Sequence, residues 1–257
     1  MEELACCTQL PDGLCQLPCL HFFQVWRAPA IKRIGPEFLN MQPSSIQRHH
    51  AHAFPRLKTL KLFGMVEWEE WDWDQQRNNA QAMPALENLL LRNCKLRCLP
   101  PGLSSQAKAL TIMYLYNIQQ LNSVESFASL VELRLFDNPN LERVTSLPSL
   151  HRLHIVRCMK MRALVGVPEL QKLVFKDLNM EKLPGYLLKD VSPRHLVLYG
   201  NLKMLTTIAA IETSQEWIKL SQFEHVNAYS DMKQWHVLYT KDPYSFETNI
   251  GNSSSSS

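Results

Sequence analysis

The phrase Leu-x-x-Leu-x-Leu occurs three times within residues 127–176, and it restricts the fold more than any other feature of the chain. Its middle leucines are Leu133, Leu153 and Leu173, so successive copies are separated by 20 residues each time. The last position becomes Ile155 in the second copy and Phe175 in the third, which keeps it apolar. Since alternate side chains of a strand point to the same side, each phrase predicts a short strand with one buried face.

A period of 20 to 29 residues with this internal pattern is typical of leucine-rich repeats. One repeat cannot bury its own apolar side, so neighbouring repeats must stack. Similar phrases extend the series, with middle anchors at Phe23, Leu60, Leu89, Met113, Leu133, Leu153, Leu173 and Leu196. We therefore predict an α/β leucine-rich-repeat solenoid of about eight repeats, with parallel strands on its concave face and irregular or short helical returns.

A second column of residues supports this alignment. Three positions after the last anchor, the sequence has Cys94, Asn138, Cys158 and Asn201, where leucine-rich repeats favour asparagine or cysteine. A side chain that turns inward there can satisfy backbone groups of the adjacent turn. The same column also holds Met65, Ile118 and Leu178, so the polar ladder is incomplete.

The pattern divides the chain into three regions. Residues 1–211 are predicted to form the repeat array, which starts inside a repeat and has long loops near residues 40–53 and 66–83. Residues 212–250 leave the repeat pattern and predict a C-terminal cap, with a helix around Trp217 and strands at residues 223–229 and 235–239. Residues 251–257 are rich in serine and predicted to be disordered. Without a polar capping unit before the first repeat, we expect a fragment or a truncated relative of a longer protein.

Composition argues against several classes of protein. A net charge of +3 over 257 residues does not indicate a nucleic-acid-binding protein, which requires a concentrated basic face. No apolar run is long enough for a signal peptide or a membrane span. The seven cysteines form no secreted framework and are expected to be reduced. These features predict a soluble cytoplasmic or nuclear protein that neither enters a membrane nor binds nucleic acid.

Sequence motifs of catalysis are missing. The chain has no phosphate-binding loop, no dinucleotide-binding turn and no nucleophile elbow, so we expect no enzyme activity and no cofactor. The candidate metal ligands are His49, His50 and His52, but a closed zinc site requires four donors and no nearby cysteine or carboxylate pair completes it. We expect no metal; a zinc hydrolase that uses these histidines is the alternative.

The fold hypothesis itself supplies a candidate binding surface. Residues between and after the anchors of each strand face outward on the concave side. This reasoning predicts the following partner-binding residues: Lys61, Phe63, Arg92, Tyr114, Tyr116, Arg134, Phe136, Arg152, His154, Lys176 and Tyr199. The neighbouring outer column adds Glu132, Lys172 and His195. Outward aromatic and arginine side chains are typical of protein interfaces; the alternative is a strand face that is merely solvated.

An alternative partner-binding patch consists of Trp68, Trp71 and Trp73, which alternate with acidic residues. Exposed tryptophans would be candidate interface hot spots. The competing interpretation, which we prefer, places the tryptophans against the side of a long repeat with the acidic residues outside.

Distinctive phrases lie at residues 10–20, 28–38, 65–71, 137–141 and 235–250. They resemble the C-terminal leucine-rich repeats of plant intracellular immune receptors, most closely the coiled-coil nucleotide-binding type of grasses. The resemblance covers about residues 10–250. It implies a role in defence, in which the repeats recognise a pathogen effector or a guarded host protein and restrain an adjoining nucleotide-binding switch. The coiled-coil and nucleotide-binding domains are absent from this sequence, so no switch residue is carried over.

The resulting hypothesis is a non-enzymatic protein-recognition module of the immune-receptor type. Its partner would be a pathogen effector, a guarded host protein or a nucleotide-binding domain. Two alternatives remain open at this point: a generic cytosolic repeat scaffold or adaptor unrelated to defence, and a truncated, non-functional paralogue.

Overall fold

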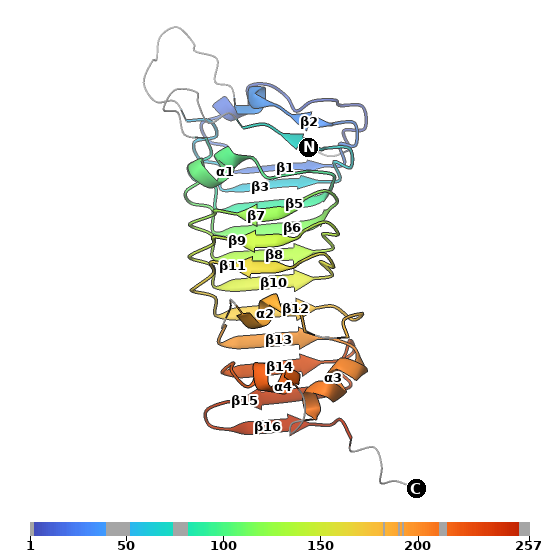
Figure 1. The fold of residues 1–257 in the computed structure, drawn as a ribbon. Coiled ribbons are helices and arrows are strands. Elements are labelled where there is room, and N and C mark those ends of the chain that lie inside the picture. The colour runs from blue at the N-terminus through green and yellow to red at the C-terminus, as the bar shows by residue number, and fades with distance from the viewer. Residues whose placement is uncertain are drawn as a thin grey trace.

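The fold is known from a computed structural model that describes residues 3–39, 52–73, 82–181, 183–189, 191, 193–210 and 215–251. It is an α/β structure with one long, mostly parallel sheet of eleven strands and few helices. Figure 1 shows the strands lying one beside the next, from β1 near the N-terminal end to β16 near the C-terminal end.

Strand order along the long sheet follows chain order. The strands are β1 (Phe22–Trp26), β3 (Thr59–Phe63), β5 (Asn88–Cys94), β6 (Ile112–Ile118), β8 (Glu132–Phe136), β10 (Arg152–Val156), β12 (Lys172–Lys176), β13 (His195–Tyr199), β14 (His225–Tyr229), β15 (His236–Thr240) and β16 (Ser245–Thr248). Neighbours from β1 to β14 are parallel, whereas β15 and β16 are antiparallel. Each parallel step therefore requires a return segment that brings the chain back.

All eight predicted strands are present, and their middle anchors are direct register partners across the sheet. The partners run from Phe23 through Leu60, Leu89, Met113, Leu133, Leu153 and Leu173 to Leu196. None of these anchors is more than 6% exposed. The predicted strand positions and the inward direction of the anchors are confirmed.

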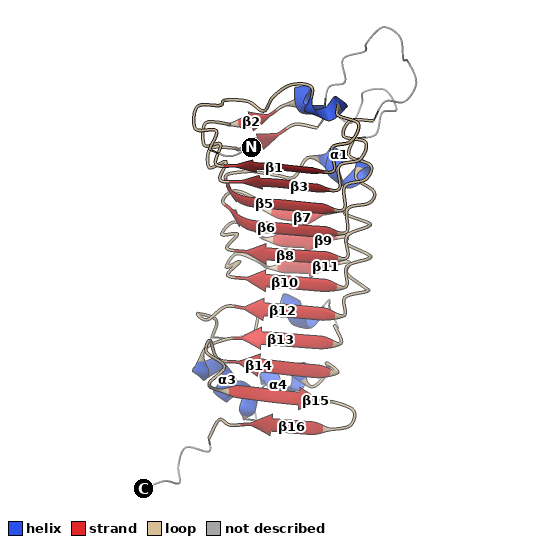
Figure 2. Cartoon of the chain, turned by 180° about the vertical axis from the view of Figure 1, so that it is seen from behind, coloured by secondary structure: helices blue, strands red, loops and turns tan. Residues whose placement is uncertain are grey.

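Three returns contain short strands, where we had expected irregular or helical returns. β7 (Ser123–Glu125), β9 (Arg143–Thr145) and β11 (Ala163–Val165) form a second parallel sheet. Figures 1 and 2, taken from opposite sides, both show it lying along one side of the long sheet. The equal 20-residue spacing explains the difference, because returns of equal length place equivalent backbone groups side by side, where they can pair.

The longer returns have other structures. β2 (Arg33–Ile34) pairs with β4 (Glu70–Trp71), and the described residues also include the 3₁₀ helices η1 (Leu14–Gln16) and η2 (Pro36–Leu39). The helices are α1 (Pro101–Gln106), α2 (Tyr186–Lys189), α3 (Leu202–Ala209) and α4 (Gln215–Leu220). None of the described helices combines the length and apolar character that crossing a membrane requires.

In six strands of the long sheet, β1, β3, β5, β6, β8 and β10, the residue directly after the last outward-facing side chain has a left-handed backbone conformation. The residues in this conformation are Arg27, Gly64, Asn93, Asn117, Asp137 and Arg157, with φ between 51° and 69°. Glycine, asparagine and aspartate adopt it at low cost, which accounts for four of the six. The turn directs the next residue into the core, where Cys94, Ile118, Asn138 and Cys158 are buried.

Asn138 has the role predicted for the asparagine column. Its side chain is fully buried; its Oδ1 accepts from the backbone N–H of Ile118 (2.9 Å) and its Nδ2 donates to the carbonyl of Leu115 (3.0 Å). Asn201, in the same column, also reaches the preceding turn, because its Nδ2 donates to the carbonyl of Met180 (3.1 Å), and in addition it caps α3, because its Oδ1 accepts from the N–H of Met204 (2.8 Å). Both side chains satisfy backbone groups that neighbouring turns leave open.

The C-terminal region contains the predicted helix (α4) and the predicted strand pair (β14 and β15). β14 also pairs in parallel with β13, so the long sheet continues into the region predicted as a cap. β16 was not predicted. Trp217 packs edge-on against Tyr239 and Phe246. Most of the predicted long loops (residues 40–51 and 74–81) and the serine tail from residue 252 lie outside the described residues.

Removal of one central anchor should destabilise the whole stack. Leu153 is fully buried between its register partners Leu133 and Leu173, so Leu153→Ala is expected to lower the free energy of unfolding by about 2–5 kcal/mol. Urea denaturation measures this change. Val165→Ala, at a position 46% exposed, is the matched control and should cost less than about 1 kcal/mol. Equal effects of the two substitutions would contradict the assigned core.

Candidate functional site

The candidate site is the outward face of β1 to β14, which we call the ladder face. Its first column is Phe22, Thr59, Asn88, Ile112, Glu132, Arg152, Lys172, His195 and His225. The second is Gln24, Lys61, Leu90, Tyr114, Arg134, His154, Val174, Val197 and Asn227, and the third is Trp26, Phe63, Arg92, Tyr116, Phe136, Val156, Lys176, Tyr199 and Tyr229.

All eleven residues predicted on the strand face lie in these columns, and each is exposed or half-buried. The alternation of buried and accessible residues along the strands produces this result, with Glu132 and Val156 as buried exceptions at outward positions. Because the strands are in register, side chains from sequence positions 20 or more residues apart become neighbours.

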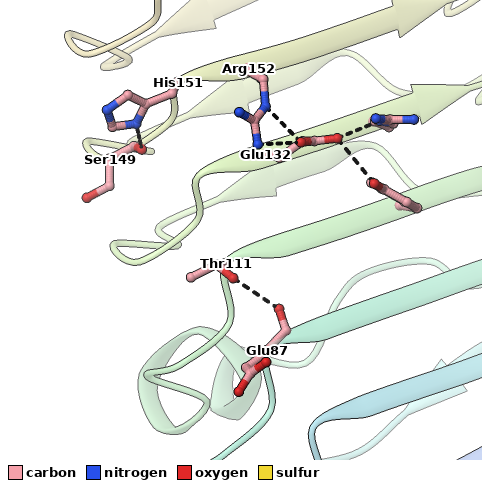
Figure 3. Close-up of polar contacts among 8 residues, drawn as sticks. Glu87, Thr111, Glu132, Ser149, His151 and Arg152 are labelled. Atoms are coloured by element: carbon pink, nitrogen blue, oxygen red, sulfur yellow. Dashed lines mark hydrogen bonds and ion pairs between the residues drawn. The ribbon is translucent and has the colours of Figure 1, made fainter.

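Glu132 occupies the middle of the ladder face but is only 5% exposed, which corrects its prediction as an outward residue. Its Oε1 accepts from Arg134 Nε (2.6 Å) and from the Tyr114 hydroxyl (3.2 Å), and its Oε2 accepts from Arg152 Nε (2.8 Å). Figure 3 shows Arg152 and two further side chains converging on this carboxylate. Three donors from three strands thus cover the acid and remove it from solvent.

The two arginines keep part of their guanidinium groups accessible. The side chain of Arg134 is 39% exposed and that of Arg152 is 52% exposed. One carboxylate therefore serves two guanidinium groups, and the cluster carries one excess positive charge. Burial alone would raise the pKa of Glu132, but the hydrogen bonds from Arg152 and Arg134 outweigh it, so the pKa lies below its usual value.

Aromatic rings and cations alternate along the third column. Trp26 meets Phe63 edge-on with centroids 5.5 Å apart, and Tyr116 stacks on Phe136 at 5.9 Å. The guanidinium of Arg92 lies 4.7 Å from the centre of the Tyr116 ring. The ring of Tyr116 thus has neighbours from the column against its faces, and its edge is left for contact with a partner.

A similar arrangement extends toward the C-terminal end. Lys176 lies 5.6 Å from the centre of the Tyr199 ring, and Tyr199 is 5.7 Å from Tyr229. Lys176 also forms an ion pair with Asp231 (2.6 Å), whose carboxylate offsets its charge. The charge of Lys176 is therefore neutralised, whereas Lys61 and Arg92 lie over aromatic rings on the same face.

Histidines on the face differ in their surroundings. Burial, with a further contribution from Arg134, lowers the pKa of His154, so this ring is mostly neutral at pH 7. His195 and His225 stack in parallel with centroids 4.5 Å apart. His151 lies just before β10, and its Nδ1 contacts the carbonyl oxygen of Ser149 at 2.7 Å (Figure 3), so it belongs to the turn.

The alternative patch at Trp68, Trp71 and Trp73 is wrong as an exposed surface, because these side chains are 0%, 4% and 5% exposed. They pack in series, with centroids 5.4 Å and 6.1 Å apart. The neighbouring acids remain outside, where Glu67 pairs with Lys95 (2.8 Å) and Glu69 pairs with Arg97 (2.6 Å). This arrangement matches the preferred interpretation, in which the aromatic residues are structural.

Of the three candidate zinc ligands, His49 and His50 lie outside the described residues. His52 is described, and its Nδ1 is buried without a hydrogen-bond partner in that part of the chain. Within the described ranges, no group of three or more histidine, cysteine, aspartate or glutamate side chains is placed to hold a metal ion.

No protein-family model matches the chain.

The ladder face offers groups that form non-covalent contacts with another molecule. It combines aromatic ring edges, accessible guanidinium and ammonium groups and one charge-paired carboxylate. Such a surface can bind a complementary polypeptide by apolar contact and charge-assisted hydrogen bonds.

Glu132→Gln should weaken the centre of the ladder face and change its pH dependence. At pH 7 we expect a loss of about 1–2 kcal/mol in the free energy of unfolding, because the amide has one acceptor oxygen where the carboxylate has two, so the arginine hydrogen bonds at the other position are lost. The loss stays modest because water screens the half-exposed arginines. A lowered folded-state pKa stabilises the protein above the unfolded value of about 4.3, and this stabilisation disappears as the pH falls through the folded value.

Urea denaturation at pH 7, 5 and 3 tests both effects. The parent should lose more stability than Glu132→Gln between pH 5 and pH 3. Glu169→Gln, on an exposed turn, serves as the control and should follow the parent. Parallel pH profiles for the parent and Glu132→Gln would show that the carboxylate is not charge-paired.

Proposed function

We propose that the chain is a leucine-rich-repeat solenoid that acts as a non-enzymatic protein-recognition module. The repeat assignment is supported by the sequence phrase, by the 20-residue register between β8, β10 and β12, and by the matching 20-residue steps of β7, β9 and β11. Stacked units of this kind present one continuous surface for binding.

The observation that carries the proposal is the ladder face. Its eleven accessible candidate residues come from seven strands and are not required to fill the core. Aromatic and arginine side chains are enriched in protein interfaces. A strand face with only a solvation role would not require Tyr116, Phe136 and Tyr199 to form a single column.

The resemblance to the repeat region of plant immune receptors supports a role in defence. On this proposal the partner is a pathogen effector, a guarded host protein or a nucleotide-binding domain. A binding role in the cytoplasm or nucleus without cofactor, nucleic acid or membrane insertion is part of the same proposal.

The experiment is a capture assay from grass leaf extract, with the chain as bait and the captured proteins identified by mass spectrometry. The binding variant combines Tyr116→Ala, Phe136→Ala and Tyr199→Ala, which leaves the Glu132 cluster intact. The matched control combines Arg143→Ala and Val165→Ala, at exposed positions on the second sheet.

A specific partner should be retained by the parent and the control, and bind the triple variant at least about tenfold more weakly, as expected for the loss of aromatic anchors. Equal capture by all three baits would remove the ladder face as the binding surface. Elemental analysis of the same protein tests the hydrolase alternative: stoichiometric zinc would support it.

A further inference from the structure

Basic residues are concentrated on the ladder face. In its three columns the lysines and arginines are Lys61, Arg92, Arg134, Arg152, Lys172 and Lys176, whereas the only acidic residue is Glu132. The whole chain has 27 lysines and arginines against 24 aspartates and glutamates, which leaves 21 against 23 outside the face. The small net positive charge of the chain therefore arises from this one surface.

Half of these cations have no carboxylate partner among the described residues. Lys61, Arg92 and Lys172 form no ion pair there; Lys61 and Arg92 instead lie over the rings of Phe22 (5.2 Å) and Tyr116 (4.7 Å). Arg134 and Arg152 share Glu132, which leaves one further charge unbalanced. A partner that supplies carboxylates could pair with these groups without breaking an existing bond.

The aromatic residues distinguish a polypeptide from a single-stranded nucleic acid. Binding of bases requires open ring faces on which they can stack. The faces of Tyr116 are covered by Arg92 and Phe136, and Tyr199 lies between Lys176 and Tyr229. The exposed ring edges can still contact aliphatic side chains, so acidic and apolar residues together fit this surface.

We propose that the ladder face binds an acidic polypeptide segment, whose carboxylates pair with Lys61, Arg92, Lys172 and the Arg134–Arg152 pair and whose apolar side chains contact the aromatic edges. This inference rests on the proposed recognition function and specifies the chemistry of its partner. The five strand-to-strand steps from β3 to β12 span roughly 24 Å at about 4.8 Å per step. An extended segment of about seven to eight residues covers that distance.

The test measures binding of two labelled twelve-residue peptides to the full chain by fluorescence anisotropy. One peptide alternates glutamate and leucine, and its control has glutamine in place of every glutamate. We expect binding of the acidic peptide to be at least about tenfold tighter, and to weaken as the salt concentration rises from 50 to 300 mM. Equal binding of the two peptides would overturn the proposal, as would stronger binding of a twelve-nucleotide oligo-dT.

A charge variant locates the site. Lys61→Gln, Arg92→Gln and Lys172→Gln together remove three cations that have no ion-pair partner in the described residues, and should weaken binding of the acidic peptide about tenfold. The control, Arg143→Gln with Lys160→Gln, changes exposed cations away from the face and should bind like the parent. Unchanged binding by the triple variant would also overturn the proposal. The comparison of the two peptides uses only the parent chain, so it remains a valid test even if a variant fails to fold.

The two proposals can fail separately. If the aromatic variant loses its captured partner while the acidic peptide does not bind, the ladder face recognises a protein but not through carboxylates. If the acidic peptide binds and no captured protein depends on the aromatic column, the charge preference stands without the recognition function.

Discussion

The alignment of inward apolar residues across the parallel sheet is the constraint on which the rest of the structure depends. Leu133, Leu153 and Leu173 are register partners, and each is fully buried. A strand of five residues cannot be stable alone, but each added strand buries its anchors against the one before it. Because side chains alternate along a strand, the register that aligns the anchors also aligns the outward residues. The ladder face is therefore a direct consequence of the core.

Glu132 shows how such a surface tolerates a buried charge. An isolated carboxylate so far removed from solvent would be strongly destabilising. Here Arg134 lies two residues away on the same strand and Arg152 is the register partner on the next strand, so both donors are positioned by the sheet itself. The same geometry leaves the outer parts of both guanidinium groups accessible. The two arginines thus stabilise the buried carboxylate and leave positive charge accessible on the surface.

Sequence reasoning located the elements that depend on periodicity and missed those that depend on packing between repeats. The strand anchors and the role of Asn138 follow from spacing and side-chain chemistry. The second sheet of β7, β9 and β11 was not predicted, because each of its strands has only three residues. Three residues are too few for an alternation of apolar and polar side chains to be recognised in the sequence. The left-handed turns could have been recognised from the column Gly64, Asn93, Asn117 and Asp137. A net charge of +3 does not indicate that the face is basic, because the charge of the face depends on which residues point outward.

The central claim is that residues 20 positions apart are direct neighbours across the sheet, and methyl–methyl nuclear Overhauser effects test it most directly. With selectively labelled leucine methyl groups, Leu153 should show contacts to both Leu133 and Leu173, which are each about 5 Å away in backbone spacing. Leu133 and Leu173 should show no direct contact, because roughly 10 Å separates strands that are two steps apart. Absence of both Leu153 contacts, or a direct contact between Leu133 and Leu173, would contradict the register and with it the ladder face.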